Sequence, residues 1–201
     1  MIRRSFMKLN TIFLLISLYL AGSAQALAKS EVAIFAGGCF WCMEPPFDKL
    51  KGVKSTTSGY IGGSESSASY KVVSAGGTGH TEAVKIEFDP AVVSYSKLLE
   101  VFWMNIDPTD TKGQFVDRGS QYRPGVFYTT ESQRELALKS RDELEKSKRF
   151  SKKIVAEITK ASKFYPAEDY HQDYYEKNPI RYKFYRFNSG RDQFLRKYWK
   201  K

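Results

Sequence analysis

The chain has 201 residues, of which 42% are hydrophobic and 27% charged, and its 32 Lys and Arg against 22 Asp and Glu give a net charge of +10. This length supports one domain with a sizeable core, and the sequence shows no internal repeat or low-complexity linker of the kind found in arrays and disordered chains. The positive charge bears on solubility and acidic partners, and it does not identify a fold.

The first 28 residues predict a secretory signal peptide. Three basic residues precede an apolar run over residues 12–21: Arg3, Arg4 and Lys8. The run is shorter than the roughly 20 residues that span a bilayer, which argues against a membrane anchor. We therefore expect cleavage after Ala26 or Ala28, export to the periplasm or the cell exterior, and no stable membrane association afterwards.

Both cysteines of the chain, Cys39 and Cys42, follow a predicted strand over residues 31–36 and a Gly-Gly turn. If a helix begins at Cys39, its unpaired N–H groups favour the thiolate form of that residue. Residues three apart share a helix face, so Cys42 lies close enough for a disulfide. The alternative is two buried cysteines that act as small hydrophobes, but this C-x-x-C spacing favours redox or catalytic use.

The rest of the chain alternates between strand and helix patterns. Strands are predicted at residues 53–61, 81–88, 125–129 and 154–159, and helices at 43–51, 94–104, 131–148 and 167–177. Ser94 caps one helix, and Thr130 with Gln133 forms a capping box for another. Residues 62–80 form a predicted glycine-rich loop. The mixed order predicts a single α+β domain over residues 29–201, a two-layer sandwich with a mixed, mainly antiparallel sheet and flanking helices.

Taken alone, most polar candidates have ordinary structural explanations. A strand carboxylate such as Glu82 is usually solvated, and a loop Asp such as Asp117 usually makes a local turn. His80 and His171 lack the spacing of a Cys2His2 zinc site, so we predict no metal. The basic and aromatic tail after residue 180 is better explained by a solvated helix than by nucleic-acid binding, because an exported protein rarely meets nucleic acid.

Several separate blocks, taken in order, resemble the type A peptide methionine sulfoxide reductases over about residues 31–188. The blocks are Gly-Gly-Cys39-Phe40-Trp41-Cys42-Met-Glu, Gly59-Tyr60, Tyr70-Lys71, Gly79-His80-Thr81-Glu82-Ala83-Val84, Asp117-Arg118-Gly119-Ser120-Gln121-Tyr122-Arg123, His171-Gln172-Asp173-Tyr174 and Asn178-Pro179. The resemblance implies an enzyme that reduces the S epimer of methionine sulfoxide, in oxidised proteins or as the free amino acid, without a bound cofactor.

The resemblance also implies a role for each matching residue. Cys39 attacks the sulfoxide sulfur, and Glu82 is the general acid that protonates the sulfoxide oxygen. The remaining matches bind substrate: Tyr70 and Tyr122 hold the oxygen, Asp117 lies on the rim, and Phe40, Trp41 and Tyr182 form apolar walls. Attack leaves a sulfenic acid on Cys39.

One departure from the family pattern concerns the second cysteine. Many relatives have glycine at the position of Cys42 and carry recycling cysteines near the C-terminus, whereas residues 43–201 here contain none. We therefore expect Cys42 to resolve the Cys39 sulfenic acid as a disulfide, which a thioredoxin-like donor then reopens.

Two other functions fit part of the pattern. An exported thioredoxin-type thiol–disulfide oxidoreductase also uses C-x-x-C after a strand, but Trp41 lies between the cysteines here and no loop proline reads as the expected cis-proline partner. A basic secreted binding module with a structural C-x-x-C clip is the non-enzymatic alternative. Release of methionine from an oxidised peptide distinguishes the three.

Overall fold

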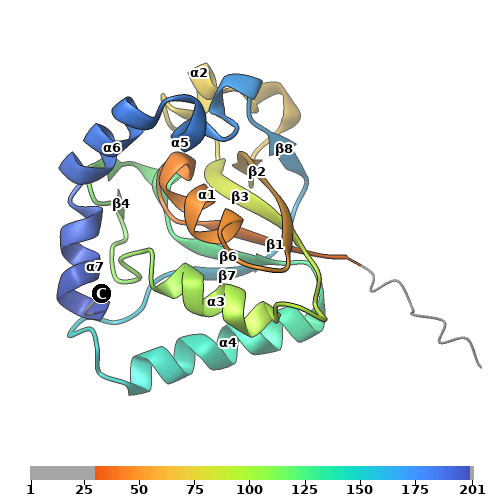
Figure 1. Ribbon diagram of the computed structural model, residues 1–201, viewed down its shortest axis with the longest axis vertical. Coiled ribbons are helices and arrows are strands. Elements are labelled where there is room, and N and C mark those ends of the chain that lie inside the picture. The colour runs from red at the N-terminus through yellow and green to blue at the C-terminus, as the bar shows by residue number, and fades with distance from the viewer. Residues whose placement is uncertain (1–29, 200–201) are drawn as a thin grey trace, which may run out of the picture.

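The computed structural model describes residues 30–199 (Figure 1). The predicted signal peptide, residues 1–28, lies outside the described residues. Within the described part of the chain, no helix is both long and apolar enough to cross a membrane.

A six-stranded mixed sheet forms the centre of the molecule. Its strands are β1 (Glu31–Ala36), β2 (Val53–Ile61), β3 (Thr81–Phe88), β6 (Gly125–Tyr128), β7 (Glu157–Lys160) and β8 (Phe164–Pro166). Their order is β7-β6-β1-β3-β2-β8, and only the β6–β7 pair is parallel. A separate two-stranded ribbon pairs β4 (Gly113–Gln114) with β5 (Asp117–Arg118). The predicted mainly antiparallel sheet is confirmed.

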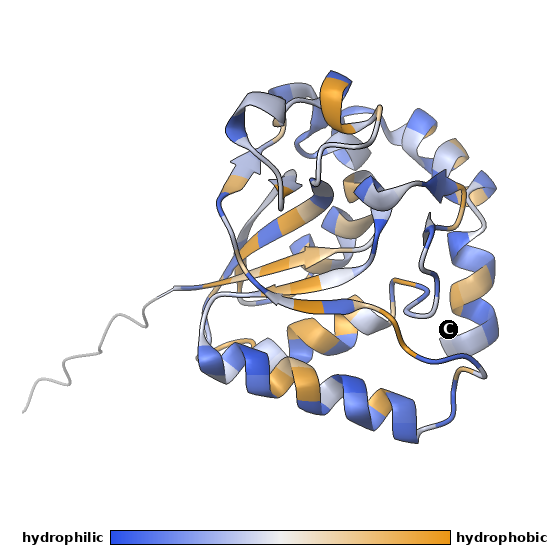
Figure 2. Cartoon of the chain, turned by 180° about the vertical axis from the view of Figure 1, so that it is seen from behind, coloured by the Kyte–Doolittle hydropathy of each residue, from blue (hydrophilic) through white to orange (hydrophobic). Residues whose placement is uncertain are grey.

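Helices line the sheet and its edges (Figure 1). They are α1 (Phe40–Asp48), α2 (Tyr70–Val73), α3 (Tyr95–Trp103), α4 (Glu131–Lys146), α5 (Tyr174–Lys177), α6 (Pro179–Asn188) and α7 (Arg191–Trp199), with short 3₁₀ turns η1 (Glu65–Ser67), η2 (Ser120–Tyr122) and η3 (Asp169–His171). Figure 2 shows hydrophobic residues along the central strands, while α4 is largely hydrophilic. The single-domain α+β fold is thus confirmed.

The pleat of β3 decides which side chains face the helices. Val84, Ile86 and Phe88 belong to the main core cluster together with residues of α1 and α3, whereas Ala83 belongs to a smaller cluster on the other face. Because successive strand residues point to opposite faces, Glu82 shares the face of Val84. Glu82 therefore points toward α1 and the cysteines.

Helix α1 differs from the prediction at its start. It begins at Phe40, ahead of the predicted start at Met43, and so places the two prolines of this segment inside the helix. Pro46 has no N–H to donate to the carbonyl of Cys42, which a regular helix would use. The guanidinium of Arg186 donates to that carbonyl instead, at 3.2 Å.

Both predicted helix caps are present. The Ser94 hydroxyl accepts from the amide of Lys97 at 3.1 Å, and the Thr130 hydroxyl accepts from that of Gln133 at 3.2 Å. The return half of the capping box differs, because the Gln133 side chain accepts from the amide of Thr129 rather than from that of Thr130.

Two other predictions need correction. Residues 167–177 do not form one helix, because Asp173 adopts a left-handed conformation (φ 53°) between η3 and α5. The predicted loop at 62–80 contains two short helices, η1 and α2.

Candidate active site

Cys39 lies at the junction between β1 and α1. It is the N-cap residue of α1 and is 7% exposed. The preceding Gly38 has φ +83°, and a Cβ built there would lie 2.6 Å from Cβ of Gln114. Only glycine fits both the backbone conformation and the space, so this turn fixes the direction from which Cys39 enters the helix.

Glu82 lies next to the same helix end. Its carboxylate oxygen Oε2 accepts a hydrogen bond from the backbone amide of Phe40 at 3.0 Å, and the residue is 1% exposed. Burial raises the pKa of Glu82 to about 8, although the Phe40 hydrogen bond lowers it. The carboxyl is therefore protonated at neutral pH, as a general acid requires.

Two tyrosines lie close enough to Cys39 and Glu82 to feel their charges. Burial raises the pKa of Tyr70 and of Tyr122, and the charges of Glu82 and Cys39 raise both further. Tyr70 comes from α2 and Tyr122 from η2, so segments far apart in sequence place both phenols around the thiol and the acid. The structure thus brings together the four residues for which the resemblance implied contact with the sulfoxide group.

Asp117 is the second carboxyl that acts on Cys39, and it has a partner that the sequence did not predict. The hydroxyl of Tyr185, on α6, donates to the Asp117 carboxylate at 2.6–2.7 Å. Burial raises the pKa of Asp117, whereas Tyr185 and Arg191 lower it. Tyr185 belongs to the basic and aromatic tail, where no motif distinguishes it from its neighbours.

The electrostatics of Cys39 differ from the expectation. Burial raises the pKa of the Cys39 thiol well above its ordinary value, the charges of Glu82, Cys42 and Asp117 raise it further, and only Tyr185 lowers it. The first amide of α1 is bound by Glu82 and not by sulfur. The expected resting thiolate is therefore wrong for the free protein, in which Cys39 is a neutral thiol.

Aromatic side chains pack around Phe40 and Trp41 at the start of α1. The ring of Trp41 stacks on Tyr174 at 3.7 Å with an interplanar angle of 4°, and its Nε1 donates to Nδ1 of His171 at 3.0 Å. The Phe40 ring lies 5.0 Å from that of His171. Burial lowers the pKa of His171, so it accepts from Trp41 as a neutral imidazole and fixes the orientation of the indole.

Tyr182 lies close to Cys42 and Arg186. The Tyr182 hydroxyl accepts from Arg186 at 3.4 Å, and the charge of Cys42 is among the influences on its pKa, which burial raises to about 12. Cys42 is completely buried, and both cysteines are free thiols. Tyr182 thus neighbours the second cysteine and not the general acid.

The two histidines have structural contacts. Nδ1 of His80 accepts from the amide of Gly63 at 3.1 Å, and its Nε2 lies 2.9 Å from the carbonyl of Ser64, so the ring ties the residue before β3 to the loop that follows β2. Over residues 30–199, no group of three or more His, Cys, Asp or Glu side chains is arranged to bind a metal.

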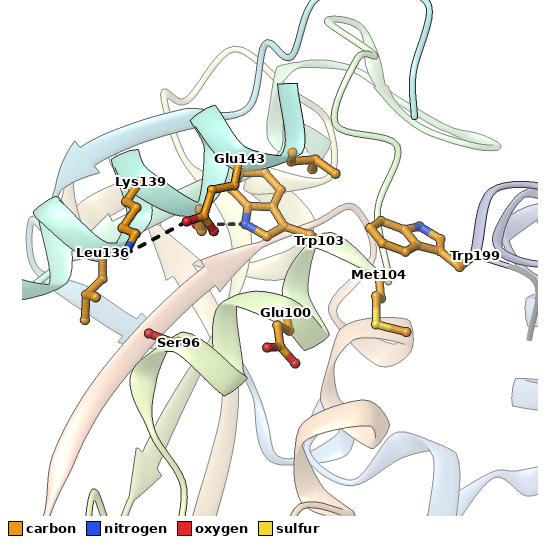
Figure 3. Close-up of a pocket in the computed structure, with 10 residues that line it drawn as sticks. Ser96, Glu100, Trp103, Met104, Leu136, Lys139, Glu143 and Trp199 are labelled. Atoms are coloured by element: carbon orange, nitrogen blue, oxygen red, sulfur yellow. Dashed lines mark hydrogen bonds and ion pairs between the residues drawn. The ribbon is translucent and has the colours of Figure 1, made fainter. Parts of the chain in front are cut away.

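A separate pocket of about 430 Å³ lies between α3, α4 and the end of α7 (Figure 3). Trp103 and Trp199 form its apolar sides, and Nε1 of Trp103 donates to the hydroxyl of Ser140 at 3.0 Å. None of the predicted site residues lines it, so we do not assign the chemistry to this pocket.

Comparison with known proteins agrees with the geometry around Cys39. Residues 31–201 match the family model described as peptide methionine sulfoxide reductase. The chain belongs to the peptide methionine sulfoxide reductase family.

Curated relatives include the peptide methionine sulfoxide reductase MsrA of Listeria monocytogenes serotype 4a, which is 55% identical over 85% of this chain and 96% of its own. The MsrA of Bacillus licheniformis is 52% identical over 85% and 94%. Reduced Mxr1 of Saccharomyces cerevisiae has the same fold, with a TM-score of 0.71 and 32% identity over 76% of this chain and 88% of the yeast chain. The protein is accordingly an oxidoreductase that reduces methionine sulfoxide, and neither the thioredoxin-type nor the binding-module alternative is retained.

Proposed function

We propose that Cys39 and Glu82 reduce the S epimer of methionine sulfoxide, either in oxidised proteins and peptides or as free methionine sulfoxide. The observation that carries this proposal is the buried Glu82 carboxyl beside the helix end that presents Cys39. Its pKa of about 8 keeps the proton at neutral pH, where the poorly electrophilic sulfoxide needs it.

In the first step, sulfur of Cys39 attacks the sulfoxide sulfur, and Glu82 gives its proton to the sulfoxide oxygen. The attack forms a bond between the two sulfur atoms. This bond and the sulfur–oxygen bond of the substrate then break as the hydroxyl group passes to Cys39, which leaves a sulfenic acid on Cys39 and releases methionine. The proton of the Cys39 thiol returns to Glu82, so the site ends with the same proton count. Tyr70 and Tyr122 hydrogen-bond the oxygen, and the aromatic wall of Phe40 and Trp41 contacts the S-methyl group.

In the second step, sulfur of Cys42 attacks the Cys39 sulfenic acid, a disulfide forms and water is released. The residues lie one helical turn apart, with the amide of Cys42 donating to the carbonyl of Cys39 at 3.1 Å. A thioredoxin-like dithiol then reduces the disulfide. Support comes from yeast Mxr1, which has also been solved in complex with Trx2.

Single-turnover chemistry tests this sequence. Given an excess of an oxidised peptide with thioredoxin as donor, the Cys42→Ser variant should reduce one equivalent of methionine sulfoxide and then stop. Cys39→Ser should release none. Sustained turnover by Cys42→Ser would mean that an external thiol resolves Cys39 directly, and methionine release by Cys39→Ser would refute the assignment of the nucleophile.

We further propose that the protein acts after export, because its first 28 residues have the pattern of a signal peptide. Fractionation of cells that express the full chain, with N-terminal sequencing of the product, tests this. Recovery of uncleaved protein in the cytoplasm would contradict it.

A further inference from the structure

Arg191 is a buried cation that the proposed chemistry does not use. It is the first residue of α7 and is 1% exposed. One guanidinium nitrogen donates to the carbonyl of Gly37 at 2.8 Å, and another donates to the carbonyl of Asn105 and lies 3.5 Å from sulfur of Met43. These contacts fix the guanidinium against the turn before Cys39 and against the first turns of α1.

The charge of Arg191 has no ion-pair partner within residues 30–199. Its polar partners are carbonyls, and its guanidinium carbon lies 4.6 Å from the centre of the Phe115 ring. Its Nε has no hydrogen-bond partner. Its charge acts on the Asp117 carboxyl from beyond ion-pair distance. Because burial of a guanidinium among neutral partners is costly, an anion that forms beside it is favoured.

A second guanidinium lies on the same side of α1. Arg186, on α6, donates to the carbonyl of Cys42 at 3.2 Å and pairs with Asp192 at 2.9 Å. The charged groups that act on Cys42 are Arg191 and Arg186, which lower its pKa, and Asp117 and Asp192, which raise it. Burial remains the largest influence and raises the pKa of Cys42.

The surroundings of Cys39 have the opposite sign. Asp117 disfavours its thiolate, as does Glu82 once it has lost its proton, and no cation is among the main influences on it. The pKa of Cys39 is raised well above the ordinary value, whereas for Cys42 the two arginines counter part of the effect of burial. Negative charge is therefore less unfavourable on the second cysteine than on the first.

We propose that Arg191 and Arg186 are positioning residues that stabilise the Cys42 thiolate, both when it attacks the Cys39 sulfenic acid and when it leaves the disulfide during recycling. The inference rests on the proposed function, because it concerns the second half of that cycle. If Cys42 is the group that leaves the disulfide, the thioredoxin-like donor must attack the sulfur of Cys39.

The electron pairs follow from that assignment. The Cys42 thiolate displaces hydroxide from Cys39, and the hydroxide takes a proton to leave as water. In recycling, a donor thiolate attacks sulfur of Cys39, the Cys39–Cys42 bond breaks, and its electron pair stays on Cys42 beside the guanidinium groups. The second donor thiol then attacks the mixed disulfide, which leaves an oxidised donor and a reduced enzyme. Cys39 is also the more exposed residue, at 7% against 0% for Cys42.

The direct test measures the pKa of Cys42 in the Cys39→Ser protein from the Cβ NMR shift of the cysteine. Replacing Arg191 by Met should raise this pKa by at least about one unit, which is a tenfold loss of thiolate. Arg191→Lys keeps a cation, so the pKa of Cys42 in this variant should stay close to its value with Arg191. An equal rise in both variants would indicate a purely structural role and overturn the proposal.

Arg149→Gln is the matched control. Arg149 lies over the ring of Trp199, 4.2 Å from its centre, and donates to the carbonyl of Tyr198, so it supports α7 without acting on Cys42. Its loss should leave the Cys42 pKa unchanged. If Arg191→Met does not fold, Arg186→Gln replaces it, and the absence of any rise in that variant overturns the proposal.

The second test follows the cycle in the two-cysteine enzyme after one equivalent of sulfoxide. Arg191→Met should release methionine at the wild-type rate but form the disulfide about tenfold more slowly at neutral pH, with the gap closing at high pH. Equal slowing of both steps, or a gap that does not depend on pH, contradicts the inference. A wild-type enzyme that releases methionine but forms no disulfide refutes the proposed resolution step instead, while the Cys42 titration still decides the role of Arg191.

The third test traps the donor. A thioredoxin that retains only its attacking cysteine should form a mixed disulfide with Cys39, leaving Cys42 free for alkylation, as located by fragmentation mass spectrometry. A mixed disulfide on Cys42 would show that the leaving group is wrongly assigned.

Discussion

The surroundings of the two cysteines differ in charge although the residues lie one helical turn apart. Cys39 meets two carboxyls, Glu82 and Asp117, whereas Cys42 meets two guanidiniums, Arg186 and Arg191. A proton donor beside Cys39 suits reduction of a sulfoxide, and cations beside Cys42 favour the thiolate that disulfide exchange needs. One C-x-x-C motif thus carries two thiols prepared for different steps.

The largest expected effect tests the acid on the Cys39 side. Glu82→Gln should slow the release of methionine in a single turnover by about 10²–10⁴-fold, the usual contribution of general acid catalysis. Glu44→Gln is the control. Glu44, in α1, is buried like Glu82, and burial raises its pKa to about 7. It is not among the main influences on Cys39. If Glu82→Gln releases methionine at the wild-type rate, Glu82 is not the general acid beside Cys39, and the contrast between the two cysteines fails.

The same carboxyl should make stability depend on pH. The pKa of Glu82 rises from 4.5 when unfolded to about 8 when folded, so the folded state keeps a proton that the unfolded state releases. Its contribution to stability is complete below pH 4.5 and is lost as pH rises toward 8, by at most about 1.4 kcal/mol per pH unit. Urea unfolding of the reduced protein at several pH values should give Glu82→Gln a shallower decline than wild type. Parallel curves would contradict the raised pKa.

The turn that introduces both cysteines can be tested with two glycines. Gly38 and Gly190 have φ of +83° and +82°, but a Cβ at Gly38 would strike Gln114 whereas one at Gly190 meets nothing within 4 Å. Both alanine variants should lose about 1–2 kcal/mol for the left-handed backbone, and Gly38→Ala about 1–3 kcal/mol more for the clash. Equal losses in urea unfolding would show that the space around Gly38 adapts.

The smallest effect concerns Tyr185. Its hydroxyl donates to Asp117 and also lowers the pKa of Cys39. Tyr185→Phe should raise the pKa of Cys39, measured by alkylation in a Cys42→Ser background, and slow methionine release by up to about tenfold. Tyr95→Phe is the control, because its buried hydroxyl has no partner in the described chain. An unchanged Cys39 pKa in Tyr185→Phe would mean that this hydroxyl hydrogen-bonds to Asp117 and not to Cys39.

The sequence predicted the centre of the fold better than its periphery. The central strands β1, β2 and β3 match the predicted ranges because each combines a clear apolar pattern with a glycine or proline at its end. β8 was missed because Phe164–Pro166 is too short to show alternation. The helix predicted over residues 167–177 was wrong because local composition did not reveal the left-handed residue Asp173.

The residues of the site also fall into a group that the sequence predicted and a group that it did not. Motif spacing located the cysteines, the acid and the tyrosines, since these residues stand in recognisable blocks around strand ends. Tyr185, Arg186 and Arg191 stand instead in a tail with many similar aromatic and basic residues, and only tertiary packing brings these three to α1. The reacting atoms could therefore be predicted, whereas the charges that tune Cys42 could not.

The hydrogen bond from Arg191 to Gly37 joins positions 154 residues apart. Because a chain is synthesised from its N-terminus, both cysteines leave the ribosome long before α7 does. The contact of Arg191 with the turn before Cys39 therefore forms only when synthesis of the chain is almost complete.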